Sequence, residues 1–283
     1  MNKIKLVVDS TIDLSEELYK KYDMDIVPLN VNFGADNFKD GVTLTRDELY
    51  ERVKKDKALP STGAASPLDY EQTFRKWLDQ GYEIISVGIG STLSTAFQSA
   101  TIAKQTIGSD KIYLIDSKNL SSASGLLALK AGKMIEEGKS AKEIAETLEK
   151  DVPNVVAQFS VETLDYLHKG GRCSGTAKVI GHLFHVHPHI LVKDGKLIVY
   201  KKPRGTMQMA INGQVEELKH ALPNVQMDNI MITDSGVTKE IRDYFVKEVS
   251  KIVDPKVIRT TPAGCVIASH CGPGTIGLLF IKK

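Results

Sequence analysis

Apolar and polar residues follow two different periods along the first half of the chain. Short apolar runs, alternating or continuous, predict strands at residues 4–8, 25–33, 84–89 and 111–116. Between them, apolar residues recur every three or four positions and predict helices at residues 14–22, 46–54, 68–80, 96–107, 124–137 and 140–150. Strands that alternate with helices predict a parallel sheet with helices on both faces.

The pattern changes after Pro153. The strands predicted beyond it are shorter and mixed with helices, at residues 155–161, 189–193, 197–200, 229–235, 256–260, 265–269 and 277–283. Asp194-Gly195 favours a type I′ hairpin, because both positions of that turn need a positive φ angle. We therefore predict an α/β fold with two domains, a parallel-sheet α/β domain at residues 1–152 and a smaller α+β domain at residues 153–283.

One turn in the first half has the composition of an anion site. Gly88 and Gly90 follow a predicted buried strand, and four hydroxyl residues come next, namely Ser91, Thr92, Ser94 and Thr95. Ser94 occupies the expected N-cap position of the following helix, whose first N–H groups have no partner inside the helix. Free N–H groups and hydroxyls at a helix N-terminus favour a bound anion. An ordinary capped turn is the alternative.

Composition excludes several classes of protein. The chain has 283 residues, 42% of them hydrophobic, and a net charge of +2, which argues against a dedicated nucleic-acid-binding protein. Its three cysteines contain no CxxC pair, which is typical of a reducing compartment. The N-terminus lacks the apolar stretch of a signal peptide, and no segment approaches the roughly 20 apolar residues of a membrane helix. We expect a cytoplasmic protein without stable membrane insertion.

Motifs for nucleotide binding and covalent catalysis are absent or lie in the wrong context. There is no Rossmann glycine pattern and no GxxxxGK[ST] loop, so we do not expect this chain to bind ATP by a standard loop. Residues 171–175 have the spacing of a nucleophile elbow centred on Cys173, but a helical pattern precedes them where an elbow needs a strand. The alternative is a helix that ends at Gly170-Gly171.

The histidines suggest two further candidates. Four histidines lie close together in the sequence: His182, His185, His187 and His189. Alternate positions would share one face of a strand, which suggests a zinc site. A polar strand face is the alternative. His270 follows a predicted strand at residues 265–268 and precedes Gly272-Pro273-Gly274. A histidine there could donate to a carboxylate near neutral pH, or it could be a structural residue of the turn.

Eight stretches of the chain resemble the DegV family of fatty-acid-binding proteins, which act as lipid-presenting subunits of bacterial fatty acid kinase. They occur in the family's order and span nearly the whole chain: VVDSTIDL, LPSTGAASP, GIGSTLSTAFQSA, LIDSKNLSSASGL, VETLDYLHKGGRCSG, LVKDGKL, RGTMQMA and SHCGPGTIGLLF. The resemblance implies a two-domain fold that encloses an acyl chain. It also implies a fatty acid ligand, a separate ATP-binding kinase as partner, and no cofactor, metal or catalytic residue in this chain.

The resemblance also implies roles for individual residues. Thr62, Ser94 with Thr95, and His270 match the positions that hold the fatty acid carboxylate. Arg172 and Arg204 match positions associated with phosphoryl transfer or kinase contact.

The chain departs from the common family pattern at Ser94-Thr95-Ala96-Phe97, after Thr62, and at Ser269-His270-Cys271, but it retains the hydroxyls and the imidazole. Preference for acyl chain length stays open. Two alternatives also stay open: a lipid carrier or sensor without a kinase partner, and a small-molecule hydrolase that uses Cys173 or His270.

Overall fold

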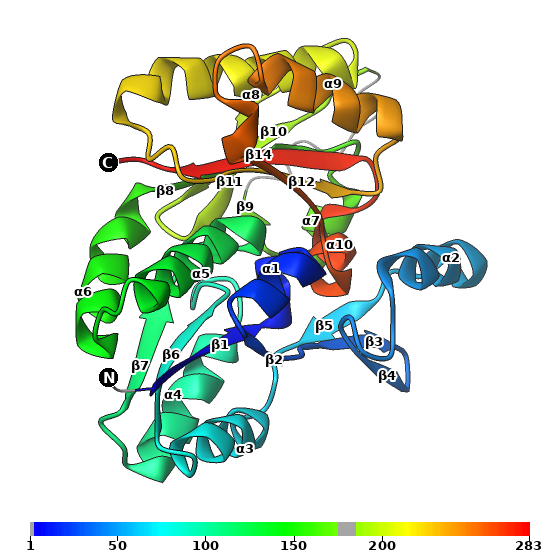
Figure 1. Ribbon diagram of the computed structural model, residues 1–283. Helices are drawn as coiled ribbons and strands as arrows, with labels where there is room; N and C mark the ends of the chain where they lie inside the picture. Colours follow the sequence, from blue (N-terminus) through cyan, green and yellow to red (C-terminus); the bar gives the residue numbers. More distant parts are fainter. Residues whose placement is uncertain (1–2, 175–184) are drawn as a thin grey trace.

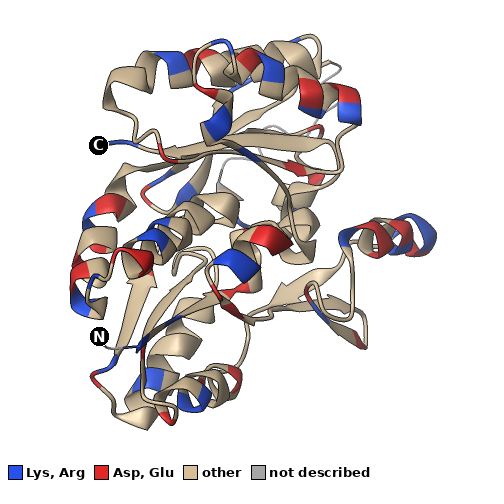
Figure 2. Cartoon of the chain, in the orientation of Figure 1, with Lys and Arg blue, Asp and Glu red and all other residues tan. Residues whose placement is uncertain are grey.

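The computed structural model describes residues 3–174 and 185–283 of the chain. Within these ranges the strands form three sheets, and helices cover the two larger ones (Figure 1). The outer helices carry many charged residues of both signs (Figure 2).

The first large sheet is parallel and has the strand order β2-β1-β6-β7. Its strands are β1 (Lys3–Asp9), β2 (Asp25–Val27), β6 (Tyr82–Gly88) and β7 (Ile112–Asp116). Helices α3 (Pro67–Leu78) and α4 (Ala96–Ile107) pack together on one face, and α5 (Ser121–Glu136) and α6 (Ala141–Asp151) on the other (Figure 1). Because both faces are covered, the central strands are continuous apolar runs such as Leu6–Val8.

The second large sheet is mixed, with the order β13-β12-β14-β8-β10-β11-β9. Its strands are β8 (Val155–Ser160), β9 (Cys173–Ser174), β10 (His189–Lys193), β11 (Lys196–Lys201), β12 (Ile230–Ser235), β13 (Ile258–Pro262) and β14 (Thr275–Ile281). Helices α8 (Met207–Ala221) and α9 (Lys239–Val249) cover its outer face and enclose a separate core around Phe245 and Phe280. Helix α5 lies between the two large sheets, which explains why it is apolar almost all round.

A small antiparallel sheet extends from the side of the molecule. It consists of β3 (Asn30–Phe33), β4 (Asp36–Lys39) and β5 (Ser61–Gly63), and it leads to the projecting helix α2 (Arg46–Asp56) (Figure 1). Helix α2 carries charges of both signs (Figure 2). Arg46 contacts Asp234 at 3.7 Å and the Tyr50 hydroxyl bonds that of Ser235, so α2 is tied to the second large sheet.

Short helices complete the described chain. They are α1 (Glu16–Lys21), α7 (Asp165–Gly170), α10 (Cys265–Cys271), and the 3-10 turns η1 (Ser10–Ile12), η2 (Val152–Asn154), η4 (Leu222–Asn224) and η5 (Pro255–Val257). Helix α10 lies where the three sheets meet, and it contacts α7, α2, β3, β5 and β12.

The predicted fold class is confirmed, and so are most of its elements. The helix capped by Ser15 and the Asp194-Gly195 hairpin, with φ angles of 50° and 71°, form as expected. Strand membership changes from the first sheet to the second between β7 and β8. One hydrophobic cluster nevertheless joins residues of both halves, such as Leu6 and Ile190, so the division into domains at residue 152 stays a prediction.

Two strand predictions are wrong. Residues 25–33 form two strands in different sheets, β2 and β3, because the chain turns at Pro28-Leu29. Residues 265–269 belong to helix α10 rather than to a strand. A short apolar run does not distinguish a buried strand from a buried helix, and the groups that cap α10 lie far away in the sequence.

Candidate functional site

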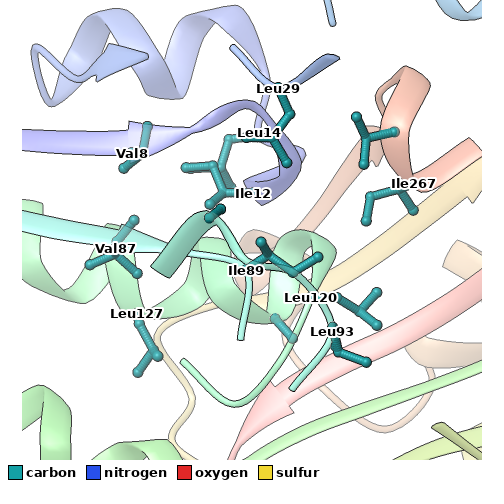
Figure 3. Close-up of a cluster of buried hydrophobic side chains, with 14 of the residues drawn as sticks. Val8, Ile12, Leu14, Leu29, Val87, Ile89, Leu93, Leu120, Leu127 and Ile267 are labelled. Carbon is teal, nitrogen blue, oxygen red and sulfur yellow. The ribbon is translucent and has the colours of Figure 1, made fainter. Parts of the chain in front are cut away.

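A cavity of about 150 Å³ lies at the carboxyl end of β6, beside α10. Its apolar lining comes from separate segments of the chain, and Figure 3 shows part of it: Leu29, Ile89, Leu93, Leu120 and Ile267. The polar lining consists of Thr62, Ser94, Thr95, Arg172 and His270. The structure therefore brings five of the six predicted site residues to one cavity.

Thr62 and His270 form the central polar contact of the cavity. The Oγ1 atom of Thr62, on β5, lies 2.8 Å from Nε2 of His270, in the last turn of α10. Burial, together with the smaller effect of the positive charge of Arg172, lowers the pKa of His270 to about 4, so the imidazole is neutral at pH 7. The sequence predicts that His270 follows a strand, but in the structure His270 belongs to helix α10.

The other ring nitrogen of His270 identifies its tautomer. Nδ1 is buried, and no described residue forms a hydrogen bond with it. The Nε2–H tautomer fits this environment, because its proton is on the nitrogen that has an acceptor. The last residue of α7, Gly170, packs against Nδ1 so closely that a Cβ atom there would lie 2.2 Å from it. The sequence pattern correctly predicts that a helix ends at Gly170-Gly171 but gives no signal of this contact.

The turn after β6 carries Ser94 to the cavity. Helix α4 begins at Ala96 with Thr95 as its N-cap, one residue later than predicted, and Ser94 Oγ accepts a hydrogen bond from the Ala96 N–H at 3.2 Å. Gly88 and Gly90 do not have positive φ angles; they are required by close packing. A Cβ atom would lie 2.1 Å from Asp9 Oδ2 at Gly88, and 2.8 Å from the backbone of residues 118–119 at Gly90.

The two predicted arginines differ in position. Arg172 lies at the edge of the cavity, where Nη1 donates to the Gly170 carbonyl at 2.8 Å and Nε donates to the Leu93 carbonyl at 3.3 Å. It thus links the end of α7 to the turn that carries Ser94. Arg204 is exposed in the segment between β11 and α8 and is not part of the cavity lining.

Comparison with known proteins identifies the family. The model of the DegV family of uncharacterised proteins matches residues 3–283. The chain belongs to the DegV family. A protein of Thermotoga maritima named fatty acid-binding protein is 30% identical to it over 289 residues, which cover 97% of this chain and 96% of the relative.

Two solved structures are also similar to this chain. A structure titled for fatty acid binding of a DegV family protein from Thermus thermophilus has a TM-score of 0.87 and 29% identity, and covers 99% of this chain and 100% of that one. A stearic acid-binding protein from Eubacterium ventriosum has a TM-score of 0.86 and 31% identity, and covers 100% of this chain and 99% of that one. Fatty acid and stearic acid are the ligands of these two proteins.

A second, apolar cavity lies beside the first in this DegV chain. It has a volume of about 30 Å³ and shares Leu120, Ile267 and Cys271 with the first cavity. Its far wall includes Phe159 and Leu279 of the second large sheet. The first cavity holds the hydroxyls and the imidazole, and the second lies on the far side of their shared wall, toward the second large sheet.

A larger hollow than the first cavity lies elsewhere. It is an open cleft of about 680 Å³ beside the β10–β11 hairpin, and its lining includes Val155, Leu191, Lys193 and Glu217. None of the predicted site residues lines it. Its openness and mixed charges fit a solvent-filled surface cleft better than a site for a buried ligand.

The nucleophile elbow and the zinc hypothesis find no support in the described residues. Helix α7, not a strand, precedes Cys173, and burial raises the pKa of its thiol to about 11, so little thiolate forms near pH 7. Strand β10 begins only at His189, so the histidines do not alternate along one strand; His182 lies outside the described residues.

Two of the described histidines of this cluster, His187 and His189, have other partners. His187 Nδ1 lies 3.2 Å from Glu162 Oε2, and His189 Nε2 lies 3.0 Å from Gln158 Oε1. Both side chains are buried, so they do not form the polar strand face that was the alternative. In the described ranges, no three His, Cys, Asp or Glu side chains gather as metal ligands.

No helix in the described part of the chain is long and apolar enough to cross a membrane.

Proposed function

We propose that this chain binds a long-chain fatty acid, with the carboxylate beside Thr62, Ser94 and His270 and the acyl chain in the apolar cavities. The observation that carries the proposal is a hydroxyl–imidazole pair at the polar end of an otherwise apolar cavity. A fatty acid has the same division between a polar head and an apolar tail. The fatty-acid-binding relatives from Thermus thermophilus and Eubacterium ventriosum support this assignment.

Neutral donors would bind the carboxylate. With its Nε2 proton donated to Thr62 Oγ1, His270 leaves the Thr62 hydroxyl proton available for the ligand. The Ser94 hydroxyl provides a second donor at the start of α4, where the helix dipole favours negative charge. Hydrogen bonds to a charged acceptor contribute about 1.5–3 kcal/mol each, so this arrangement binds and orients the head group without a buried salt bridge.

The acyl chain would provide most of the affinity. Burial of about 14 methylenes at about 0.8 kcal/mol each gives about 11 kcal/mol before the costs of association and ordering. The cavities of about 150 and 30 Å³ are smaller than the roughly 300 Å³ or more of typical ligand sites. Apolar side chains must therefore move when the tail enters, whereas the polar end is already assembled.

We extend the proposal to the presentation of this carboxylate to a separate ATP-binding kinase. A carboxylate oxygen would attack the γ-phosphorus of ATP on the kinase, ADP would leave, and the product would be an acyl phosphate. Arg172, at the edge of the cavity, is positioned to stabilise the developing negative charge. Exposed Arg204 suits a contact with the kinase surface. The absence of a phosphate-binding loop motif in the sequence favours ATP on the partner.

Lipid binding is tested on the purified protein by native mass spectrometry followed by lipid extraction, and then by binding of palmitate and hexadecanol. Thr62→Ala with Ser94→Ala should weaken palmitate binding by about tenfold or more, because two donors to the carboxylate are lost. Hexadecanol binding should change little. The matched control is Ser61→Ala with Ser91→Ala, two exposed hydroxyls beside the same positions. Equal palmitate affinity in both double variants would overturn the head-group assignment.

The kinase role is tested by formation of acyl phosphate from bound palmitate, ATP and the candidate kinase. Arg172→Ala should retain palmitate but lose acyl phosphate. If wild-type protein loaded with palmitate yields no acyl phosphate with the kinase, the role as kinase subunit is wrong and a carrier or sensor role remains. Ester hydrolysis by the purified chain alone would instead favour the hydrolase.

A further inference from the structure

Helix α10 begins without a capping side chain of its own. Its N-cap residue is Gly264, so nothing in the adjacent sequence accepts its first N–H groups. Two aspartates from the N-terminal part of the chain accept them instead. Asp13 Oδ1 accepts from the Gly264 N–H at 2.8 Å, and Asp40 accepts from the N–H groups of Cys265 at 2.7 Å and Val266 at 3.4 Å.

Both carboxylates are held firmly. Each side chain is only 3% exposed. Ser121 of α5 donates its hydroxyl to Asp13 Oδ2, and Ser10 of η1 donates to Asp40 Oδ2 at 2.9 Å. Both carboxylates lie at the positive end of the α10 dipole, which favours negative charge. Burial raises the pKa of both groups, and these hydrogen bonds oppose that rise.

The opposite end of α10 carries the imidazole. His270 is five positions after Cys265, about 7–8 Å along the helix axis. A helix this short moves as one body, so a shift at its N-terminus is passed on to His270. The Thr62–His270 contact of 2.8 Å tolerates only about 0.7 Å of movement before it exceeds the 3.5 Å limit of a hydrogen bond.

We propose that Asp13 and Asp40 are positioning residues for His270: they fix α10 so that its imidazole meets Thr62, and they thereby set the preference of the cavity for a carboxylate. This inference rests on the proposed fatty acid site, but neither aspartate lines the cavity. Loss of either carboxylate leaves buried N–H groups without acceptors, and α10 shifts or frays to reach others. The apolar lining remains, so an uncharged ligand with the same tail still binds.

The experiment compares palmitate with hexadecanol, since a positioning role alters the ratio of their affinities and a general loss of stability lowers both. The variants are Asp40→Asn, Asp13→Ala and His270→Ala. Asp40→Asn replaces Oδ2 by an amide that cannot accept from Val266. The matched control is Asp151→Asn, at a buried carboxylate that pairs with Lys130 away from the cavity. Asp13→Asn, which can still accept from Gly264 and donate to Ser121, should rescue the loss seen with Asp13→Ala.

In the wild type, we expect palmitate to bind about tenfold or more tightly than hexadecanol. His270→Ala, Asp40→Asn and Asp13→Ala should each reduce that ratio by several-fold, whereas Asp151→Asn should leave it unchanged. The NMR shift of the His270 Nε2 nitrogen should move in both aspartate variants. If Asp13→Ala does not fold, the affinity ratio and the Nε2 shift of Asp40→Asn decide whether the positioning role is correct.

Failure of this inference differs from failure of the proposed function. If His270→Ala abolishes the preference for palmitate but Asp40→Asn keeps both the wild-type ratio and the wild-type Nε2 shift, the positioning role is overturned and the site stands. If the wild type itself shows no preference for palmitate, the head-group site is wrong and the positioning role fails with it.

Discussion

Replacement of Gly170 by alanine tests how closely α7 packs against the imidazole. A Cβ atom at this position would lie 2.2 Å from His270 Nδ1 and 3.0 Å from Cε1, whereas ordinary contacts begin near 3.4 Å. The φ angle of Gly170 is not in the left-handed region, so alanine meets no backbone strain and the effect is steric. The ring must therefore move by about 1 Å, which exceeds the roughly 0.7 Å that the Thr62 contact tolerates.

The magnitude follows from two opposing terms. Overpacking of a buried contact costs about 1–3 kcal/mol, and the Gly→Ala change in a helix returns about 0.5–1 kcal/mol. We expect Gly170→Ala to lower the free energy of unfolding by about 1–2 kcal/mol. Because its imidazole no longer meets Thr62, we also expect about tenfold weaker palmitate binding, with hexadecanol affected much less.

Urea denaturation and ligand binding, measured on the same preparations, provide the assay. Gly213→Ala in α8 is the control, because a Cβ atom there meets no heavy atom within 4 Å. It should be more stable than wild type by about 0.5–1 kcal/mol and bind palmitate normally. If Gly170→Ala gains stability as Gly213→Ala does and binds palmitate like wild type, the packing of Gly170 on His270 is refuted.

Three further predictions concern pH, packing and thiol reactivity. Between pH 6.5 and about 4, the free energy of unfolding of the wild type should fall relative to that of His270→Gln by at most about 3 kcal/mol in urea titrations. The reason is that burial lowers the pKa of His270 to about 4 in the folded state, so the unfolded chain is protonated first as the pH falls. A difference that does not depend on pH would contradict this. Gly88→Ala should cost about 1–3 kcal/mol by urea denaturation, since its Cβ would lie 2.1 Å from Asp9 Oδ2; stability equal to that of Gly213→Ala would argue against this contact. Cys271 is buried in the cavity wall, and burial raises its pKa to about 12. Iodoacetamide at pH 8 should therefore alkylate Cys271 slowly, and still more slowly when palmitate is bound, as measured by mass spectrometry. Alkylation rates equal to those of the protein unfolded in urea would rule this out.

Local patterns predicted the parts of this fold whose causes are local. Helix α1 has its cap in Ser15, and the β10–β11 hairpin has its turn in Asp194-Gly195. The parallel sheet followed from the alternation of strands and helices. The grouping of Thr62, Ser94 and His270 came from family resemblance, because no periodicity relates positions so distant in the chain.

The errors arose where distant residues determine the structure. The apolar run of helix α10 predicts a strand, because the carboxylates that accept its first N–H groups, those of Asp13 and Asp40, are far away in the sequence. The sequence places Gly88 in a turn, but the side chain of Asp9 on the neighbouring strand is what excludes a Cβ atom there. Gly170 shows the same limit, since its contact with His270 appears only in three dimensions.

The anchoring of α10 has a consequence for synthesis of the chain. Asp13 and Gly264 are separated by 251 residues, and Asp40 and Cys265 by 225. At about 5–20 residues per second, a ribosome needs about 13–50 s to pass from the first of these partners to the last. For most of that interval Thr62 and Ser94 have been made, but α10, which bears His270, has not. Under the proposed function, the head-group site is therefore incomplete in a nascent chain until α10, with His270, has been translated.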